Sequence, residues 1–194
     1  ENLEKGFAEI LRVLKPNGVF VNGASVIAAD NLASNGVIHV INTVLMPPTG
    51  NIVETAQANS NFTYLVAAVV RASAGSTNVA EVLSGAGPLT VFAPTNQAFI
   101  NAGFPTIASI QAADPATLTN ILTYHVVAGR VLSSDLTEGA TPATVNGANV
   151  TISLAAGAKV KGAGNATAST ISPANLITTN GVIHVIDQVL LPNN

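Results

Sequence analysis

Apolar residues recur at helical spacing in the first segment of the chain. They are Leu3, Phe7, Ile10, Leu11 and Leu14. Residues three and four apart share one face of a helix, and Pro16 and Gly18 do not continue one. The pattern therefore predicts an amphipathic helix of uncertain origin within residues 1–18.

Short β patterns follow this helix. Residues 19–21 and 25–27 are rich in valine and flank a turn that contains Asn-Gly, which favours a hairpin. Residues 37–45 form a nearly continuous apolar run, which predicts a buried strand. The proline-containing segment 47–50 then predicts a short linker.

Helical spacing returns after the linker. The apolar residues that carry it are Ile52, Ala56, Phe62, Leu65, Val66, Val69 and Val70, followed by Val79, Val82 and Leu83. Residues 89–93 predict a strand, and Thr95 is expected to cap a helix that turns Ala98 and Phe99 inward. Asp114 and Pro115 predict another helix start, because Asp accepts backbone N–H groups and proline lacks the N–H that would be unpaired there.

From Val126 onward the pattern changes to period two, with turn residues between short apolar segments. Asn146-Gly147 lies between 144–145 and 150–152, which predicts a hairpin. Residues 159–161, 168–171 and 182–190 predict further strands. Helices first and strands later indicate the α+β class.

One phrase occurs twice in the chain. Residues 35–47 read NGVIHVINTVLMP and residues 180–192 read NGVIHVIDQVLLP, so an offset of 145 relates Asn35 to Asn180. The likeness extends backward, where Asp30 corresponds to Asn175. A spacing of this size suits one whole domain, so the chain is expected to hold the end of one repeat followed by a second repeat.

The composition of the chain excludes several classes of function. The chain is 48% hydrophobic and 9% charged, with a formal net charge of −3. Seven Lys and Arg residues are too few for the clustered basic surface that nucleic acids require. The absence of cysteine excludes disulfides and thiolate zinc sites. No apolar run approaches the roughly 18 residues of a membrane helix, so no membrane span is expected.

The second repeat resembles the fasciclin domain family. It carries that family's landmarks in order: LTVFAPTNQAF at 89–99, YHVV at 124–127 and NGVIHVIDQVLLP at 180–192. The resemblance implies an α+β fold, with several helices packed on a β-sandwich or wedge. It also implies a secreted or cell-surface protein, in tandem repeats, that mediates adhesion.

The resemblance divides the chain into three parts. Residues 1–18 are the helix, 19–48 match only the C-terminal part of a preceding fasciclin-like repeat, and 49–194 make a complete domain. Two or three strands cannot bury an apolar face by themselves, so something must cover 19–48. The candidates are the helix in 1–18, the complete domain, or a neighbouring copy, and the last would make a head-to-tail assembly.

The candidate motif residues have structural interpretations beside the functional ones. His39 and His184 are equivalent positions flanked by Ile and Val, so each is expected to bond backbone or hydroxyl groups within a β-ladder. Tyr124 and His125 resemble the family's Tyr-His pair, whose surroundings are linked with adhesion in animal members. The remaining candidates are Asn180, Gly181 and Asp187, and the Asp187 carboxylate is expected to accept bonds from loop N–H groups or a hydroxyl.

No catalytic, cofactor or metal constellation stands out. No serine lies in a G-x-S-x-G motif, and no carboxylate pair suggests acid–base chemistry. The sequence therefore predicts a non-enzymatic extracellular adhesion module without a cofactor, whose partners are other copies of itself or matrix and cell-surface proteins. The alternatives are a subunit of an extracellular filament, in which 1–48 complete a neighbouring copy, and a module that binds an envelope carbohydrate or lipid.

Overall fold

The computed structural model describes residues 20–21, 24–42, 44–45 and 47–193. The chain divides into two compact units, Glu1–Pro47 and Pro48–Asn194, called unit 1 and unit 2 below. The helix predicted within 1–18 lies outside the described residues. Within the described part, no helix has the length and apolar content needed to cross a membrane.

Unit 1 holds an antiparallel sheet of order β1-β2-β3. Its strands are β1 (Phe20–Val21), β2 (Ala24–Ala33) and β3 (Gly36–Ile41). The prediction of a buried strand over 37–45 was wrong in two respects. The strand ends at Ile41, and three of its side chains are exposed by 42%, 58% and 41% at Val37, Ile38 and Val40. Burial requires a covering layer, which a short apolar sequence cannot specify by itself.

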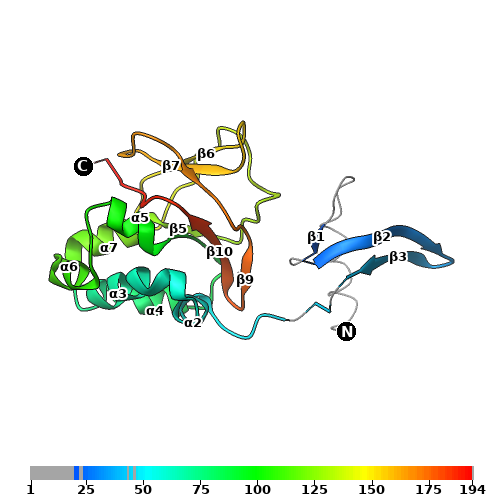
Figure 1. Cartoon of the computed structure of the whole chain (residues 1–194), viewed down its shortest axis with the longest axis horizontal. Helices are drawn as coiled ribbons and strands as arrows, with labels where there is room; N and C mark the ends of the chain where they lie inside the picture. Colours follow the sequence, from blue (N-terminus) through cyan, green and yellow to red (C-terminus); the bar gives the residue numbers. More distant parts are fainter. Residues whose placement is uncertain (1–19, 22–23, 43, 46, 194) are drawn as a thin grey trace. The chain divides into compact units, whose positions relative to one another are not determined.

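Unit 2 begins with helices that cover one side of a sheet (Figure 1). They are α2 (Ile52–Gln57), the 3₁₀ turn η1 (Ser60–Phe62), α3 (Thr63–Ala72), α4 (Val79–Ser84), α5 (Asn96–Asn101), α6 (Ile107–Ala112) and α7 (Pro115–Tyr124). The predicted caps are present: the Thr95 hydroxyl accepts the N–H of Ala98 at 3.3 Å, and Asp114 accepts the N–H of Thr117 at 2.9 Å.

The central sheet of unit 2 has the order β5-β4-β10-β9. Its strands are β4 (Leu89–Pro94), β5 (Val126–Ala128), β9 (Leu176–Thr178) and β10 (Gly181–Ile186). Strands β4 and β10 run parallel, with Leu89 opposite Gly181 and Pro94 opposite Ile186. The strand predicted over 182–190 therefore ends at Ile186, and the residues beyond it leave the sheet.

A second sheet of order β6-β7-β8 lies on the other side of the central sheet (Figure 1). Its strands are β6 (Val150–Ser153), β7 (Lys159–Gly162) and β8 (Ser169–Thr170). The hairpin predicted around Asn146-Gly147 was only partly right. The turn forms, and Ala143 bridges Asn149, but the ladder of β6 is made with β7.

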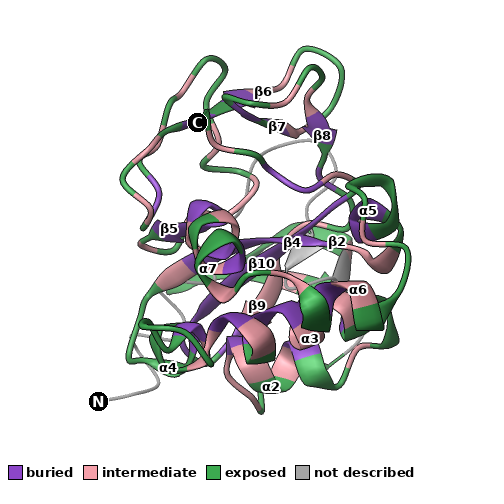
Figure 2. Ribbon diagram, turned by 90° about the vertical axis from the view of Figure 1, so that its left-hand side faces the viewer, coloured by how far each residue is buried: buried purple, intermediate pink, exposed green. Residues whose placement is uncertain are grey.

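The two sides of the central sheet bury separate apolar clusters (Figure 2). The cluster on the helical side includes Phe62, Val91, Phe99, Leu118 and Ile183. The cluster toward β6 and β7 includes Phe92, Tyr124, Ile152, Val160 and Ile186. Helices on one side and strands on the other confirm the predicted α+β class.

Candidate functional site

Asn180, just before β10, has a buried side chain that forms a junction by hydrogen bonding to two helices. Its Oδ1 accepts the N–H of Ile52 at 2.9 Å, at the start of α2. Its Nδ2 donates to the carbonyls of Leu83 and Gly85, both at 2.9 Å, at the end of α4. Because the side chain is only 7% exposed, these bonds replace water and hold the helices against the sheet.

Gly181 lies opposite Leu89 in the parallel pair of β4 and β10. A Cβ atom at this position would stand 2.1 Å from the carbonyl oxygen of Leu89, which no side chain tolerates. Gly87 has the reciprocal constraint, because its Cβ would stand 2.1 Å from the carbonyl oxygen of Asn180. The Asn-Gly pair therefore serves the packing of the sheet.

Tyr124 ends α7 and is fully buried. Its hydroxyl donates to the carbonyl of Asn149 at 2.6 Å and accepts the N–H of Ala163 at 2.9 Å. The phenol thus joins α7 to the segments on either side of β6 and β7. Both hydrogen-bonding functions of the hydroxyl are used inside the domain.

His125 follows Tyr124 and is 2% exposed. Its Nε2 accepts the N–H of Leu190 at 2.8 Å, so the proton of the neutral ring lies on Nδ1, which donates to the carbonyl of Ile121 at 2.8 Å. Burial lowers the pKa of His125 to about 4, because desolvation disfavours the charged ring more than the Ile121 carbonyl favours it. The ring is a neutral structural link.

His184 lies in β10 and is also neutral. Its Nδ1 accepts the N–H of Asn175 at 3.2 Å, and its Nε2 donates to the carbonyl of Val131 at 2.9 Å. Desolvation lowers its pKa and outweighs the bond to Val131. The partners are backbone groups of the kind predicted, and the ring also faces Phe92 at a centroid distance of 5.7 Å.

Asp187 follows the end of β10. Its Oδ1 accepts the hydroxyl of Ser169 and the N–H of Thr170, both at 2.8 Å. Partial burial raises the pKa of Asp187, but these hydrogen bonds outweigh it and keep the pKa below its ordinary value. The sequence predicted acceptance of N–H or hydroxyl donors, and the structure adds that these donors belong to β8, which the carboxylate holds against the segment after β10.

The six candidate residues therefore do not converge on one open site. Tyr124 and His125 end α7, Asn180 and Gly181 begin β10, and His184 and Asp187 lie along and beyond that strand. Each polar group among them is bonded within unit 2. Among the described residues, no three His, Cys, Asp or Glu side chains gather in a way that could hold a metal ion.

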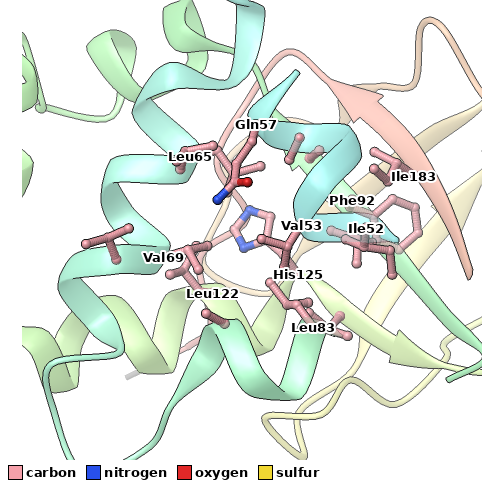
Figure 3. A pocket seen from close by; sticks show the side chains of 17 residues that line it. Ile52, Val53, Gln57, Leu65, Val69, Leu83, Phe92, Leu122, His125 and Ile183 are labelled. Carbon is pink, nitrogen blue, oxygen red and sulfur yellow. The ribbon is translucent and has the colours of Figure 1, made fainter. Parts of the chain in front are cut away.

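A small apolar cavity, which the sequence did not indicate, lies between α2, α3, α4 and the central sheet. Figure 3 shows Gln57 and His125 pointing into a space lined otherwise by aliphatic and aromatic side chains. Its volume of about 60 Å³ is well below the ~150 Å³ of a cavity that binds benzene. It suits one aliphatic group and is too small for a sugar ring.

Unit 1 repeats the local geometry around His184. Asp30 and Asn175 both have left-handed backbone, with φ of 56° and 59°. The N–H of Asp30 donates to Nδ1 of His39 at 3.1 Å, matching the bond from Asn175 to His184. Non-glycine residues seldom adopt this conformation, so its recurrence shows that both units build the same bulged strand pair.

The strand registers agree as well. In unit 1 the pairs are Ala33 with Gly36, Leu32 with Val37, Asn31 with Ile38 and Val26 with Ile41. In unit 2 they are Thr178 with Gly181, Ile177 with Val182, Leu176 with Ile183 and Ile171 with Ile186. The offset of 145 holds at every pair. The two identical hexapeptides GVIHVI thus occupy equivalent positions in equivalent hairpins.

Comparison with known proteins gives a consistent result. The fasciclin domain family matches residues 3–47 and 58–192. The uncharacterized protein sll1735 of Synechocystis is 40% identical over 141 residues, which cover 73% of this chain and 97% of that protein. Protein sll1483 of the same organism is 36% identical over 174 residues, covering 89% of this chain and 91% of that protein.

A solved structure has the same fold. It is a FAS1 domain pair from the insect cell adhesion molecule Fasciclin I, with a TM-score of 0.60 and 19% sequence identity. The match covers 87% of this chain and 60% of that chain.

Proposed function

Because the chain belongs to the fasciclin domain family, we propose that it is a non-enzymatic extracellular adhesion module that acts through protein–protein or matrix contacts. The observation that carries the proposal is the apolar surface of unit 1, called the hairpin surface below. It consists of Ile27, Leu32, Val37, Ile38 and Val40, which are exposed by 65%, 85%, 42%, 58% and 41%. Leu32 and Val37 lie on one face of the hairpin, and Ile38 and Val40 lie on the other. Neighbouring exposed apolar side chains are typical of protein contact sites.

The state of the buried polar groups supports a non-enzymatic role. A general acid or base must reach a substrate, yet both nitrogens of His125 and of His184 are bonded to backbone groups. The Asp187 carboxylate is likewise bonded to Ser169 and Thr170. The two histidine rings are buried and their nitrogens are not presented to a ligand, whereas Asp187 is exposed and engages one carboxylate oxygen in these bonds.

The low charge supports contact with uncharged protein surfaces. With seven basic and ten acidic residues in 194, the chain lacks the field that steers nucleic acids or highly charged partners. We place the protein outside the cell or on its surface, with other copies of itself or matrix and cell-surface proteins as partners. The insect protein of the same fold is a cell adhesion molecule.

We also propose that residues 19–48 are the C-terminal part of a preceding repeat. The offset of 145, the shared registers and the two left-handed residues support this assignment. Residues 49–194 then form one complete domain, with both apolar clusters inside it.

An attachment assay with the full chain tests the proposal. Beads coated with the chain are applied to surfaces that carry the same chain, matrix protein or cells, under shear. The account predicts attachment to at least one of them above an albumin-coated control. Attachment equal to the albumin control on all three surfaces would overturn the proposal.

A filament subunit is the second candidate, in which residues 1–48 complete a neighbouring copy. The observation that favours it is the position of β3 at the edge of its described sheet. Light scattering with electron microscopy tests this candidate. Polymers that disappear when Val37 and Ile38 are replaced by lysine would support a filament, and a monomer mass at high concentration would exclude it.

A further inference from the structure

The apolar cavity of unit 2 extends from the protein surface to the central sheet. Gln57, at the end of α2, and Val70, in α3, line it and are exposed. Phe92 of β4 and Ile183 of β10 line it as well and are buried. Because the lining passes from exposed to buried residues, the cavity opens between α2 and α3, and a small molecule can enter it.

The buried part of this cavity favours an alkyl group over water. Apart from His125 and Gln57, the described side chains that line it are aliphatic or aromatic. Both nitrogens of His125 are bonded to backbone groups of Ile121 and Leu190, so the ring offers the cavity no free polar atom. A water molecule needs two to four polar partners to occupy a cavity, whereas apolar cavities stay dry and bind apolar groups.

Gln57 supplies a polar group at the mouth of the cavity. Its side chain points into the space between the helices (Figure 3). With the described residues its amide forms no hydrogen bond, unlike Gln97 on α5, whose Nε2 donates to Asn101 at 2.9 Å. A free amide offers one acceptor and two donors, so it can bond the hydroxyl, ester or amide group of a ligand.

We propose that the cavity is a binding site for a small uncharged amphiphile. The unbranched alkyl end of this molecule enters the buried part, and its hydroxyl, ester or amide group bonds the side chain of Gln57. The site lies within unit 2, whereas the proposed adhesive surface lies in unit 1. It therefore goes beyond the proposed function and does not depend on it.

The absence of charge from the lining selects an uncharged polar group on the ligand. In the described part of the chain, no Lys, Arg, Asp or Glu side chain lines the cavity. The charged residues of α2, α3 and α4 are Glu54, Arg71 and Glu81. Glu54 accepts the N–H of Asn51 at 2.8 Å, and Arg71 donates to the carbonyl of Ala113 at 2.9 Å. A carboxylate or phosphate group would therefore lose water at the mouth without gaining a counter-ion.

The volume of the cavity limits the length and shape of the alkyl end. A volume of about 60 Å³, compared with the ~150 Å³ that holds the six carbons of benzene, has room for about two or three carbon atoms. Further carbons would lie against Val53, Val66 and Val70 at the mouth, where burial is partial. A ring does not fit, and a bilayer lipid has chains too long for its polar group to reach Gln57.

The test uses the full chain with isotope-labelled Ile, Leu and Val methyl groups, followed by NMR. The ligands are the linear alcohols from 1-propanol to 1-octanol, with cyclohexylmethanol as the bulky probe and xenon as the apolar probe. Methyl groups of Ile52, Leu83 and Ile183 report on the cavity that they line. Those of Ile152 and Val160, in the cluster on the other side of the central sheet, serve as controls.

We expect the linear alcohols to shift the cavity methyl groups saturably and to leave the control methyl groups unchanged. Affinity should rise about fourfold with each methylene that enters the buried part, and should stop rising once the cavity and its mouth are filled. Cyclohexylmethanol should bind about tenfold more weakly than 1-hexanol, because a ring would overpack the cavity.

Three variants test the assignment of the site. Ala80→Leu fills the cavity and should weaken 1-hexanol binding by about tenfold. Ala67→Leu changes another half-buried alanine of the same cluster, which does not line the cavity, and should leave the affinity unchanged. Gln57→Leu should weaken 1-hexanol binding by about fivefold, because one hydrogen bond is lost, and should leave xenon binding unchanged.

Several results would overturn the inference. They are the absence of saturable shifts at the cavity methyl groups, affinity that rises by a constant factor through 1-octanol, and equal 1-hexanol binding by Ala80→Leu. Undiminished 1-hexanol binding by Gln57→Leu would overturn the assignment of the polar group. If Ala80→Leu does not fold, the alcohol series and xenon on the unsubstituted chain still decide. The bead assay is independent of this test, because it reports on the surface of unit 1.

Discussion

Nε2 of His125 accepts the backbone N–H of Leu190 at 2.8 Å, joining the end of α7 to the segment after β10. The bond exists only while the ring is neutral, because a protonated Nε2 would present a second donor to the same N–H. The stability of unit 2 should therefore depend on pH through this ring.

The folded pKa of His125 is about 4, below the 6.5 of the unperturbed ring. The unfolded chain therefore binds a proton first as the pH falls, so stability is complete above pH 6.5 and declines toward pH 4. The total loss should approach about 3 kcal/mol. His184 acts in the same direction.

Urea unfolding between pH 7 and pH 5 measures this loss. The chain has no tryptophan, and both tyrosines, Tyr64 and Tyr124, lie in unit 2, so tyrosine fluorescence reports that unit alone. His125→Gln should be less stable at pH 7 but should show a smaller decline. An unfolding midpoint that stays constant from pH 7 to pH 5 in the unsubstituted chain would contradict the assignment.

The two equivalent glycines allow a matched comparison. Gly181→Ala should destabilise unit 2 by more than about 2 kcal/mol, because the new Cβ meets the Leu89 carbonyl and the backbones must separate. Gly36→Ala should leave the unfolding midpoint of unit 2 unchanged and should preserve the β2–β3 hairpin. If circular dichroism showed that Gly36→Ala costs unit 1 as much stability as Gly181→Ala costs unit 2, the glycines would act through intrinsic strand propensity instead.

Asn180 and Asn35 occupy equivalent positions in the two repeats and allow a second matched comparison. Asn180→Ala removes the buried hydrogen-bond partner of the Ile52 N–H and of the Leu83 and Gly85 carbonyls. The free energy of unfolding of unit 2 should therefore fall by roughly 2–4 kcal/mol. Asn35 is exposed, and Asn35→Ala should change the stability by less than about 0.5 kcal/mol. Chemical denaturation measures both losses, with tyrosine fluorescence following unit 2 for Asn180→Ala and circular dichroism following unit 1 for Asn35→Ala. Equal losses would contradict the role of Asn180 as a junction.

Asp187 differs from its counterpart Asn42 in the repeated phrase. Asp187→Asn keeps an oxygen for Ser169 and Thr170 and should cost about 1 kcal/mol at neutral pH. Asp187→Ala leaves both donors without this acceptor and should cost about twice as much. The gap between the unsubstituted chain and Asp187→Asn should narrow as the pH falls from the ordinary carboxyl range through the lower pKa of folded Asp187, because the unfolded chain takes up the proton first.

Much of unit 2 could be predicted because its signals are local. Thr95 and Asp114 indicate helix starts because their side-chain oxygens can accept backbone N–H groups of the first turn. The repeated phrase identifies the family. Helix α6 was missed because Ile107–Ala112 is short, and only Ile110 in it is buried. The partner of β6 was missed because a turn does not specify which strand completes the sheet.

The hexapeptide GVIHVI shows most clearly that the burial of a strand cannot be predicted from its own residues. It is buried at 181–186 and largely exposed at 36–41, although the residues are identical. The difference arises from β4 and the helices of unit 2, which lie far away in the sequence. Candidate roles for His125 and His184 could be proposed from the sequence, but their bonding to Leu190 and Val131 depends on that tertiary packing.

The most direct measurement compares bead attachment for two matched variants of the full chain. One replaces Leu32, Ile38 and Val40 of the hairpin surface with serine, and the other replaces Val70, Val82 and Val145 of unit 2, which are also exposed. The account predicts that the first variant loses attachment while the second attaches like the unsubstituted chain. Attachment retained by the first variant, or lost equally by both, would contradict the claim that unit 1 carries the contact surface.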